Sequence, residues 1–349
     1  MTKLNDKYEL VLAEACDSEA IKYLFENSGY PYAIDLQFGR GDDPYRSIME
    51  EDDGAIVVLL KETSTQKVVS MGVCSFHKIW LNGEKKRGAY LNSLKILPEH
   101  RKGAIFISKA FEMVFELSRN DTDIYYAAIL EQASSTRKMF EKKRSNMPEY
   151  VKQDLYTTFC FKPSGRLHGM ELEKGNVDGL DDFYEKCLKN YNLAPLNRNI
   201  NGIKDEDFIV WRKNGKIIAA CAVFNNKNNK NYWLNGYNGI LKYIYHIPVH
   251  YLGYPKFPRP GSIVNIASLS MLMFDENVTV KERAKFIKAA SYYAKQYDVL
   301  MVGLAQNDIS YEAFSKIKHI KYSSIIYTIN ENKSKNLTNR SIYSDVAFM

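Results

Sequence analysis

The sequence predicts an α/β protein of two domains, and three observations lead to this prediction. The chain has 349 residues, more than a single hydrophobic core usually serves. Hydrophobic residues make up 45% of the chain and charged residues 26%, as in folded globular proteins rather than disordered ones. Strand-like and helix-like patterns alternate through the first half and recur in a similar order in the second, which favours an α/β fold in each.

The first elements are defined by short apolar runs and their flanking residues. Residues 8–13 predict a strand, and residues 17–29 predict a helix that begins at an Asp-Ser cap and ends at Gly29. Two apolar runs joined by the polar turn Thr-Ser-Thr-Gln predict a hairpin of strands over residues 54–62 and 67–83.

The next strand leads into the longest helix of this half. The strand is expected over residues 87–98, because Pro98 cannot extend it. Apolar residues recur every three or four positions between residues 101 and 119, which predicts a helix there. The remaining elements are strands expected over residues 123–130 and 155–162 and a helix over residues 134–143.

Two segments of the second half parallel two strands of the first, which suggests a diverged duplication. Lys216 follows Lys67 by 149 residues in one matching pair of segments, and Asp298 follows Asp123 by 175 in the other. The second half therefore carries 26 additional residues between these points, and the aromatic segment 232–261 is the candidate insertion. This segment could line a hydrophobic acceptor pocket or be buried between the domains.

The duplication places the domain boundary at the turn Lys-Pro-Ser-Gly that begins at Lys162. We expect one domain over residues 1–163 and a second over residues 164–349.

Composition and terminal sequence indicate an intracellular, cytoplasmic protein. The five cysteines show no paired spacing, and the polar N-terminus does not resemble a signal peptide. We interpret the net charge of +7 as a mild excess spread along the chain, so nucleic acid is not an expected partner. His246 and His250 are four residues apart, but Pro248 lies between them and no glutamate completes an HExxH motif, so we expect no metal site.

The most informative stretch is Ile-Leu-Pro-Glu-His-Arg-Lys-Gly-Ala-Ile-Phe, which begins at Ile96 and leads into the long helix. The first turn of a helix presents free amides and the positive end of the helix dipole, both of which favour a phosphate. Gly103 allows close backbone approach, and Arg101 and Lys102 add positive charge. The turn therefore predicts an anion site; the alternative is the charged start of a surface helix.

The order of elements, together with this turn, resembles the GNAT superfamily of acyl-CoA-dependent N-acyltransferases. The turn of that superfamily reads Arg/Gln-x-x-Gly-x-Gly/Ala; here Ala104 and Phe106 occupy the two small positions and Gly103 is shifted by one. The chain resembles a bacterial group of tandem GNAT proteins more closely, through residues 147–159, 254–275 and 343–349. The resemblance implies two GNAT-like domains, each a mixed, largely antiparallel sheet flanked by helices.

The same resemblance implies a co-substrate and the residues that hold it. Acetyl-CoA or another acyl-CoA is expected in the first domain, with the backbone amide of Ile96 contacting the thioester carbonyl. The second domain has Asp275, Glu276 and Asn277 before its helix, where carboxylates would repel a diphosphate, so we expect it to be degenerate. The candidate cofactor-binding residues are Leu94, Ile96, Arg101, Lys102, Gly103, Ala104, Ile105 and Phe106.

Acyl transfer needs a deprotonated amine and a proton source for the leaving thiolate. Glu131 ends the fifth strand and is the candidate base, although it could equally be a solvated surface residue. The GNAT tyrosine that protonates the thiolate is replaced by Phe140, and the usual helix asparagine by Ala133. Tyr90 and Asn92 are the candidate polar substitutes.

The resemblance leaves several partners open. The acceptor is expected to be a small-molecule or peptide amine, no membrane partner is expected, and a homodimer is possible. One alternative is an aminoacyl-tRNA-dependent transferase, which would need a basic channel. Another is a protein that binds acyl-CoA or a partner without turnover, which the missing tyrosine and asparagine would explain.

Overall fold

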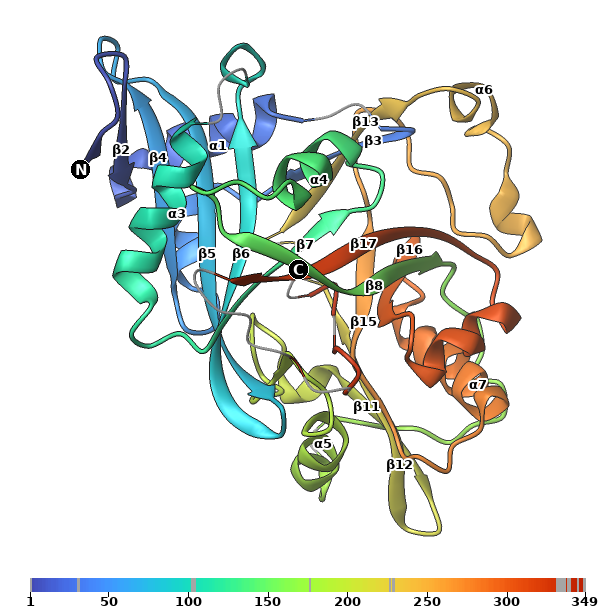
Figure 1. Cartoon of the computed structure of the whole chain (residues 1–349). Helices are drawn as coiled ribbons and strands as arrows, with labels where there is room; N and C mark the ends of the chain where they lie inside the picture. The colour runs from blue at the N-terminus through green and yellow to red at the C-terminus, as the bar shows by residue number, and fades with distance from the viewer. Residues whose placement is uncertain are drawn as a thin grey trace.

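A single long, twisted β-sheet runs through both halves of the chain, with helices against both of its faces (Figure 1). The computed structural model describes residues 2–29, 32–101, 105–175, 177–225, 227, 230–330, 337, 340–343 and 345–347. The strands of the sheet are β1 (Thr2–Lys3), β2 (Tyr8–Leu12), β4 (Ala55–Glu62), β5 (Val68–Leu81), β6 (Glu84–Ile96), β7 (Ile124–Leu130), β8 (Glu149–Phe161), β9 (Glu173–Lys174), β10 (Ala194–Pro195), β11 (Phe208–Lys213), β12 (Lys216–Phe224), β15 (Ile266–Phe274), β16 (Val299–Ala305) and β17 (His319–Asn330).

The strand order is β1-β2-β4-β5-β6-β7-β17-β8-β16-β15-β12-β11-β9, and β10 pairs with the end of β5. Among the described residues, β6–β7 and β15–β16 are the parallel pairs and the other pairs are antiparallel. The expected mixed, largely antiparallel sheet flanked by helices is therefore confirmed.

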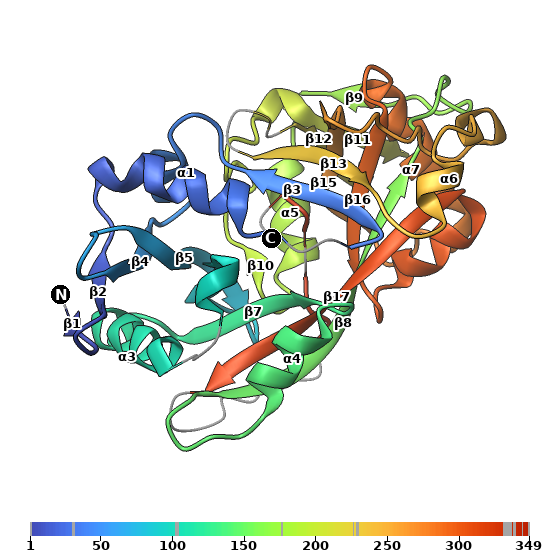
Figure 2. The same ribbon diagram turned by 90° about the horizontal axis from the view of Figure 1, so that it is seen from above.

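The helices cover both faces of the sheet. Figure 2 shows α1 and α3 on opposite faces of its first half. In α1, Ile21, Leu24 and Phe25 are spaced to form one buried stripe, as the sequence pattern predicts. The helices are α1 (Ser18–Asn27), α2 (Pro44–Met49), α3 (Ile105–Ser118), α4 (Ser134–Glu141), α5 (Leu180–Leu188), α6 (Leu241–Ile244) and α7 (Val280–Ala290), and the short 3-10 helices are η1 (Ala15–Asp17), η2 (Pro98–His100), η3 (Asp205–Asp207), η4 (Val249–Leu252), η5 (Ser291–Ala294) and η6 (Ile309–Lys316). Among the described residues, no helix combines the length and the apolar character that crossing a bilayer requires.

Two strands begin earlier in the chain than the sequence predicts. The strand expected from residue 87 begins three residues earlier, at the start of β6, because the hairpin with β5 pairs Leu81 with Glu84. The strand expected from residue 155 begins at Glu149, because β17 pairs along the whole of β8.

The two halves exchange strands in the middle of the sheet. β17, from the end of the chain, lies between β7 and β8, and β8 lies between β17 and β16. Each half therefore contributes a strand that is hydrogen-bonded to strands of the other. The division into residues 1–163 and 164–349, and the duplication behind it, stay predictions.

The aromatic insertion forms a small separate sheet with a strand of the first half. β13 (Asn231–Tyr237) pairs with β3 (Ile34–Gly39) on one edge and β14 (Ser262–Ile263) on the other (Figure 2). Leu234 and Tyr237 of β13 are buried, but the side chains of residues 240–254 are largely exposed. Burial of the insertion between the halves is thus a correct expectation for part of β13 and a wrong one for residues 240–254.

Candidate active site

The parallel strands β6 and β7 separate shortly after they meet. They pair at Gly88, Ala89 and Tyr90, which lie opposite residues 124–126, and show no pairing beyond Tyr90. On the other edge of β6, Met71 pairs with Lys95 but Val73 pairs with Asn92, so residues 93 and 94 face a single residue of β5. This bulge, in which Ser93 has φ of +51°, bends β6 away from β7.

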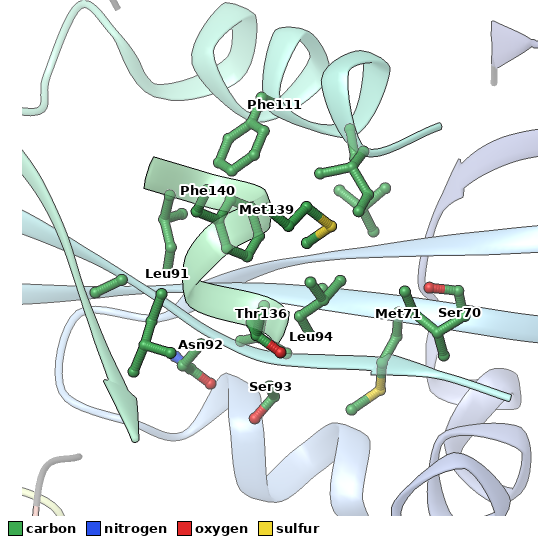
Figure 3. A pocket seen from close by; sticks show the side chains of 18 of the residues that line it. Ser70, Met71, Leu91, Asn92, Ser93, Leu94, Phe111, Thr136, Met139 and Phe140 are labelled. Carbon is green, nitrogen blue, oxygen red and sulfur yellow. The ribbon is translucent and has the colours of Figure 1, made fainter. Parts of the chain in front are cut away.

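A cavity of about 580 Å³ opens where the strands part, beneath α3 and α4. Its volume lies in the usual range of small-molecule sites, roughly 300–1,000 Å³. In Figure 3, Phe111, Met139 and Phe140 extend from these helices into the open space. The lining is mostly aliphatic and aromatic and comprises Leu10, Val58, Leu60, Ser70, Met71, Gly72, Val73, Leu91, Asn92, Ser93, Leu94, Ile96, Arg101, Phe106, Ile107, Ala110, Phe111, Val114, Ala127, Ala128, Ile129, Leu130, Ala133, Ser135, Thr136, Met139, Phe140 and Tyr150.

The backbone amide of Ile96 faces the gap between the strands. The next amide, of Leu97, donates a hydrogen bond to the carbonyl of Val69 on β5 at 3.0 Å. Successive amides of a strand point to opposite edges, so the amide of Ile96 points away from β5 and towards β7. An amide in this position can donate to an oxygen of a ligand lying in the cavity.

Four of the eight predicted cofactor residues line this cavity: Leu94, Ile96, Arg101 and Phe106. Ile105 begins α3, and residues 102–104 lie outside the described part of the chain. The guanidinium of Arg101 donates to the carbonyls of Ile96 (3.3 Å), Ser28 (3.1 Å) and Gly29 (3.3 Å). It therefore ties the turn to the end of α1 as well as lining the cavity.

The three predicted catalytic residues are not brought together in the cavity. Asn92 lines it, but Glu131 and Tyr90 do not. Glu131 is exposed at the end of β7. Tyr90 is buried and stacks on Tyr126 with ring centroids 5.2 Å apart, and burial raises its pKa well above the ordinary value.

Tyr150 is a cavity residue that the sequence reasoning missed. Its ring stacks on Phe140 with centroids 4.6 Å apart and meets the ring of Phe111 edge-on at 6.3 Å. Burial raises the pKa of the Tyr150 phenol well above the ordinary value. The segment Met-Pro-Glu-Tyr could have pointed to this tyrosine. The predicted strand began only at residue 155, however, and so left Tyr150 outside the sheet.

A buried ionic network lies behind Asn92. The amide nitrogen of Asn92 donates to Ser75 Oγ (3.0 Å), and Ser75 Oγ donates to Glu51 (2.9 Å). Glu51 also accepts from Arg40 (2.6 Å) and lies 3.5 Å from the ammonium of Lys230, which comes from the second half of the chain. The other four members of this network are all buried: Ser75, Glu51, Arg40 and Lys230.

The charges in this network determine the ionisation of Glu51. Burial alone would raise the pKa of its carboxyl, but Lys230 and Arg40 together outweigh burial and lower the pKa to about 2. Burial in turn lowers the pKa of Lys230. Glu51 is therefore an anion at neutral pH, held between two cations.

In the second half, the helix that follows the parallel strand β15 is α7. At the start of α7, the amide of Glu282 donates to Thr279 Oγ1 (3.3 Å), and the Glu282 carboxylate accepts from the Thr279 amide (3.0 Å). Just before it, Asp275 pairs with Lys186 at 2.8 Å. The first turn of α7 is thus capped by its own side chains.

Comparison with known proteins relates the fold to acyltransferases of known structure. No protein-family model and no curated protein matches the sequence. N-myristoyltransferase of Saccharomyces cerevisiae, solved with bound myristoyl-CoA, superposes with a TM-score of 0.65 over 98% of this chain and 90% of its own, at 10% identity. A probable N-acyltransferase from Enterococcus faecalis V583 gives 0.51 over 93% and 72%, at 8% identity.

A third similar structure is a region of a fungal multi-domain β-N-acetylglucosaminidase described as a GCN5-related glucosamine N-acetyltransferase. It superposes with a TM-score of 0.61 over 92% of this chain and 38% of its own, at 10% identity. The chain therefore has the fold of the GNAT-type N-acyltransferases.

Proposed function

We propose that this protein is an acyl-CoA-dependent N-acyltransferase. The observation that carries the proposal is the parting of β6 and β7 over an apolar cavity, with the Ile96 amide facing the gap. The thiol arm and acyl group of an acyl-CoA, acetyl or longer, would occupy this cavity. The apolar lining suits a flexible chain, and an amide donor suits the thioester carbonyl.

We propose roles in acyl transfer for two residues at the cavity, Ile96 and Tyr150, and for Glu131 at the nearby end of β7. The acceptor amine attacks the thioester carbon, and the C–S bond breaks as the C–N bond forms. The Ile96 amide would stabilise the negative charge that develops on the carbonyl oxygen. Glu131, directly or through a water, would take the amine proton; Tyr150 would give its proton to the leaving thiolate.

We also propose that the turn at residues 101–106 holds the diphosphate of the co-substrate. The supporting features are the basic residues of the turn, the start of α3 directly after it, and the position of Arg101 at the cavity. The proposal does not require Arg101 to leave the carbonyls it binds, because a guanidinium has five donor hydrogens.

Thermal unfolding in the presence of two ligands tests binding in the cavity and binding of the diphosphate by the turn separately. An acyl-CoA at 100 times its Kd should stabilise the protein by about 2.7 kcal/mol, which corresponds to roughly 4 °C in Tm. The matching S-acyl pantetheine, which lacks the nucleotide and its diphosphate, should give a much smaller shift at equal concentration.

The two ligands can contradict the role of the turn and the binding of acyl-CoA separately. Equal shifts would mean that the turn contributes nothing, and the absence of any shift would remove the acyl-CoA proposal itself. Release of free thiol from the acyl-CoA in the presence of a panel of amines then separates an enzyme from a protein that only binds.

The affinity for acyl-CoA is expected to rise as the acyl chain is lengthened from acetyl. Each methylene that enters the apolar cavity should contribute about 0.8 kcal/mol, or nearly fourfold in Kd, until the cavity is full. Ala110 on α3 lines the cavity, so Ala110→Phe should weaken binding of the longer chains while leaving acetyl-CoA nearly unaffected. Calorimetric titration of a C2-to-C14 series against both proteins measures this, and a flat series would show that the acyl group lies outside the cavity.

A further inference from the structure

The exposed hydrophobic side chains of this protein are concentrated in one short segment. Seventeen large hydrophobic residues are exposed among the described residues, and seven of them fall between residues 240 and 254. Ile240 and Tyr251 are 75% and 82% exposed. The seven are Ile240, Tyr243, Ile244, Ile247, Tyr251, Leu252 and Tyr254. Single exposed hydrophobic residues are ordinary on a protein surface, but a concentrated group marks an interaction site.

This segment, which we call the apolar segment (residues 240–254), projects from the body of the protein. Figure 1 shows it, with α6, at the outer edge of the molecule beyond the small sheet of β3 and β13. It comprises the single turn of α6 and the 3-10 helix η4. Neither is long enough to bury these side chains against the sheet by itself.

Lysines from the main sheet and its loops hold the inner side of the apolar segment. The ammonium of Lys162 donates to the carbonyl of His250 at 3.0 Å, and that of Lys318 donates to the carbonyl of Leu252 at 2.8 Å. Lys318 also lies 5.7 Å from the centre of the Tyr254 ring. The backbone of the segment is thereby fixed while its apolar side chains face outward.

The charge of the chain is also concentrated around this region, contrary to the even spread expected from the total. Residues 208–274 contain eight lysines and arginines and no aspartate or glutamate. The whole chain has 48 basic and 41 acidic residues, so the remainder holds 40 basic and 41 acidic. The positive excess of the protein therefore comes entirely from this stretch.

Not all eight cations are near the apolar segment, and those that are can be identified. Lys230 is buried against Glu51, Lys227 lies between β12 and β13, and the basic residues of the β11–β12 hairpin lie at the far end of the molecule (Figure 1). Lys242 and Arg259 are exposed within or beside the segment, and Lys256 is exposed and pairs with Asp298 at 3.2 Å. Lys242, Lys256 and Arg259 therefore lie in or beside the segment, and Lys162 and Lys318 contact its backbone, so five cations accompany the apolar side chains.

We propose that the apolar segment docks the protein onto an anionic phospholipid surface. Tyrosine side chains favour the interface between lipid and water, and aliphatic tips enter the boundary of the acyl chains. Lysine and arginine beside them are attracted to acidic headgroups, each by an amount worth roughly fivefold in affinity. A short projecting segment with cations beside it suits an acidic membrane surface, whereas a stable interface between two copies buries about 800 Å² on each partner. This inference does not depend on the proposed catalytic function.

Vesicle flotation with the full chain tests the proposal. The protein should bind vesicles of phosphatidylcholine and phosphatidylglycerol (7:3), bind pure phosphatidylcholine much less, and lose binding as salt is raised. Tyr251→Ser/Leu252→Ser should reduce binding at least tenfold. Tyr23→Ser/Leu117→Ser, which removes another exposed tyrosine and leucine, from α1 and α3, should leave it unchanged.

A charge pair completes the test. Lys242→Glu/Arg259→Glu should reduce binding more than tenfold, whereas Lys204→Glu/Lys216→Glu, with the same change in net charge at distant exposed sites, should have a much smaller effect. Equal effects of the two pairs, or no binding to acidic vesicles, would overturn the proposal. So would a dimer in solution that Tyr251→Ser/Leu252→Ser dissociates, because a second copy would then cover the segment.

Discussion

Replacing Glu51 by glutamine is expected to lower the free energy of unfolding by about 3–5 kcal/mol, the usual cost of breaking a buried ion pair from one side. The reason is that Arg40 and Lys230 would remain buried without the carboxylate that neutralises them. Urea unfolding at pH 7 measures the change. Because Lys230 comes from the second half of the chain, the loss should affect the whole cooperative transition.

The neighbouring residue provides a matched control. Glu50 pairs with Arg46 at 2.6 Å, but both side chains are exposed, so Glu50→Gln should cost no more than about 0.5 kcal/mol. Adding Lys230→Met to Glu51→Gln should recover part of the loss, because one uncompensated cation is removed. Equal stabilities of the Glu50 and Glu51 variants would show that the network contributes nothing to folding.

The loss of stability caused by Glu51→Gln is expected to depend on pH. The pKa of Glu51 falls from 4.5 to about 2 on folding, so its contribution to stability is complete above pH 4.5 and is lost as pH falls towards 2. The stability difference between the wild type and Glu51→Gln should therefore be constant from pH 7 to pH 5 and shrink below that. A difference that persists unchanged at pH 3 would mean that the carboxyl is not ionised in the way proposed.

Replacing Tyr150 by phenylalanine is expected to lower kcat about 100-fold, the lower range for removing a general acid. The phenol is the proposed proton source for the thiolate, and the aromatic ring that stacks on Phe140 would be retained. KM for the acyl-CoA and the thermal stability should change little, because the lost group is one hydroxyl. Initial rates of thiol release against acyl-CoA concentration measure both constants.

A rescue variant distinguishes proton donation from packing. Phe140 occupies the helix position at which the GNAT tyrosine is expected, and its ring lies against that of Tyr150. Phe140→Tyr in the Tyr150→Phe background restores a phenol on the adjacent ring, so it should recover a substantial part of kcat. If kcat is unaffected by Tyr150→Phe, the proton comes from water or from another group, and Tyr150 only lines the cavity.

Much of the fold could be predicted from local sequence alone, and four of the eight predicted cofactor residues line the cavity. The alternation of apolar residues, the proline after Leu97 and the three-to-four spacing in α3 depend on neighbouring residues, and the elements they predict are present. The cavity residues Leu94, Ile96 and Phe106 belong to this local stretch, since the strand, the turn and the helix follow one another in the chain.

The predicted polar substitutes could not be told apart from local sequence. Tyr90 and Asn92 are two residues apart and so share one face of β6. Because β7 pairs with β6 as far as Tyr90 and not beyond, Tyr90 packs against Tyr126, whereas Asn92 lies where the strands have parted and lines the cavity. The point at which two strands separate depends on the neighbouring strand, which the local pattern does not contain.

The sequence by itself determined the order of the elements, the apolar character of the cavity and the basic, aromatic composition of the 208–274 stretch. Only the tertiary structure decided that β17 lies between β7 and β8, that Tyr150 therefore stands beside Phe140, and that Lys230 meets Glu51. The physical reason is that strand pairing and ion pairing join residues far apart in the chain. Their energies depend on backbone edges and burial that exist only once the sheet has assembled.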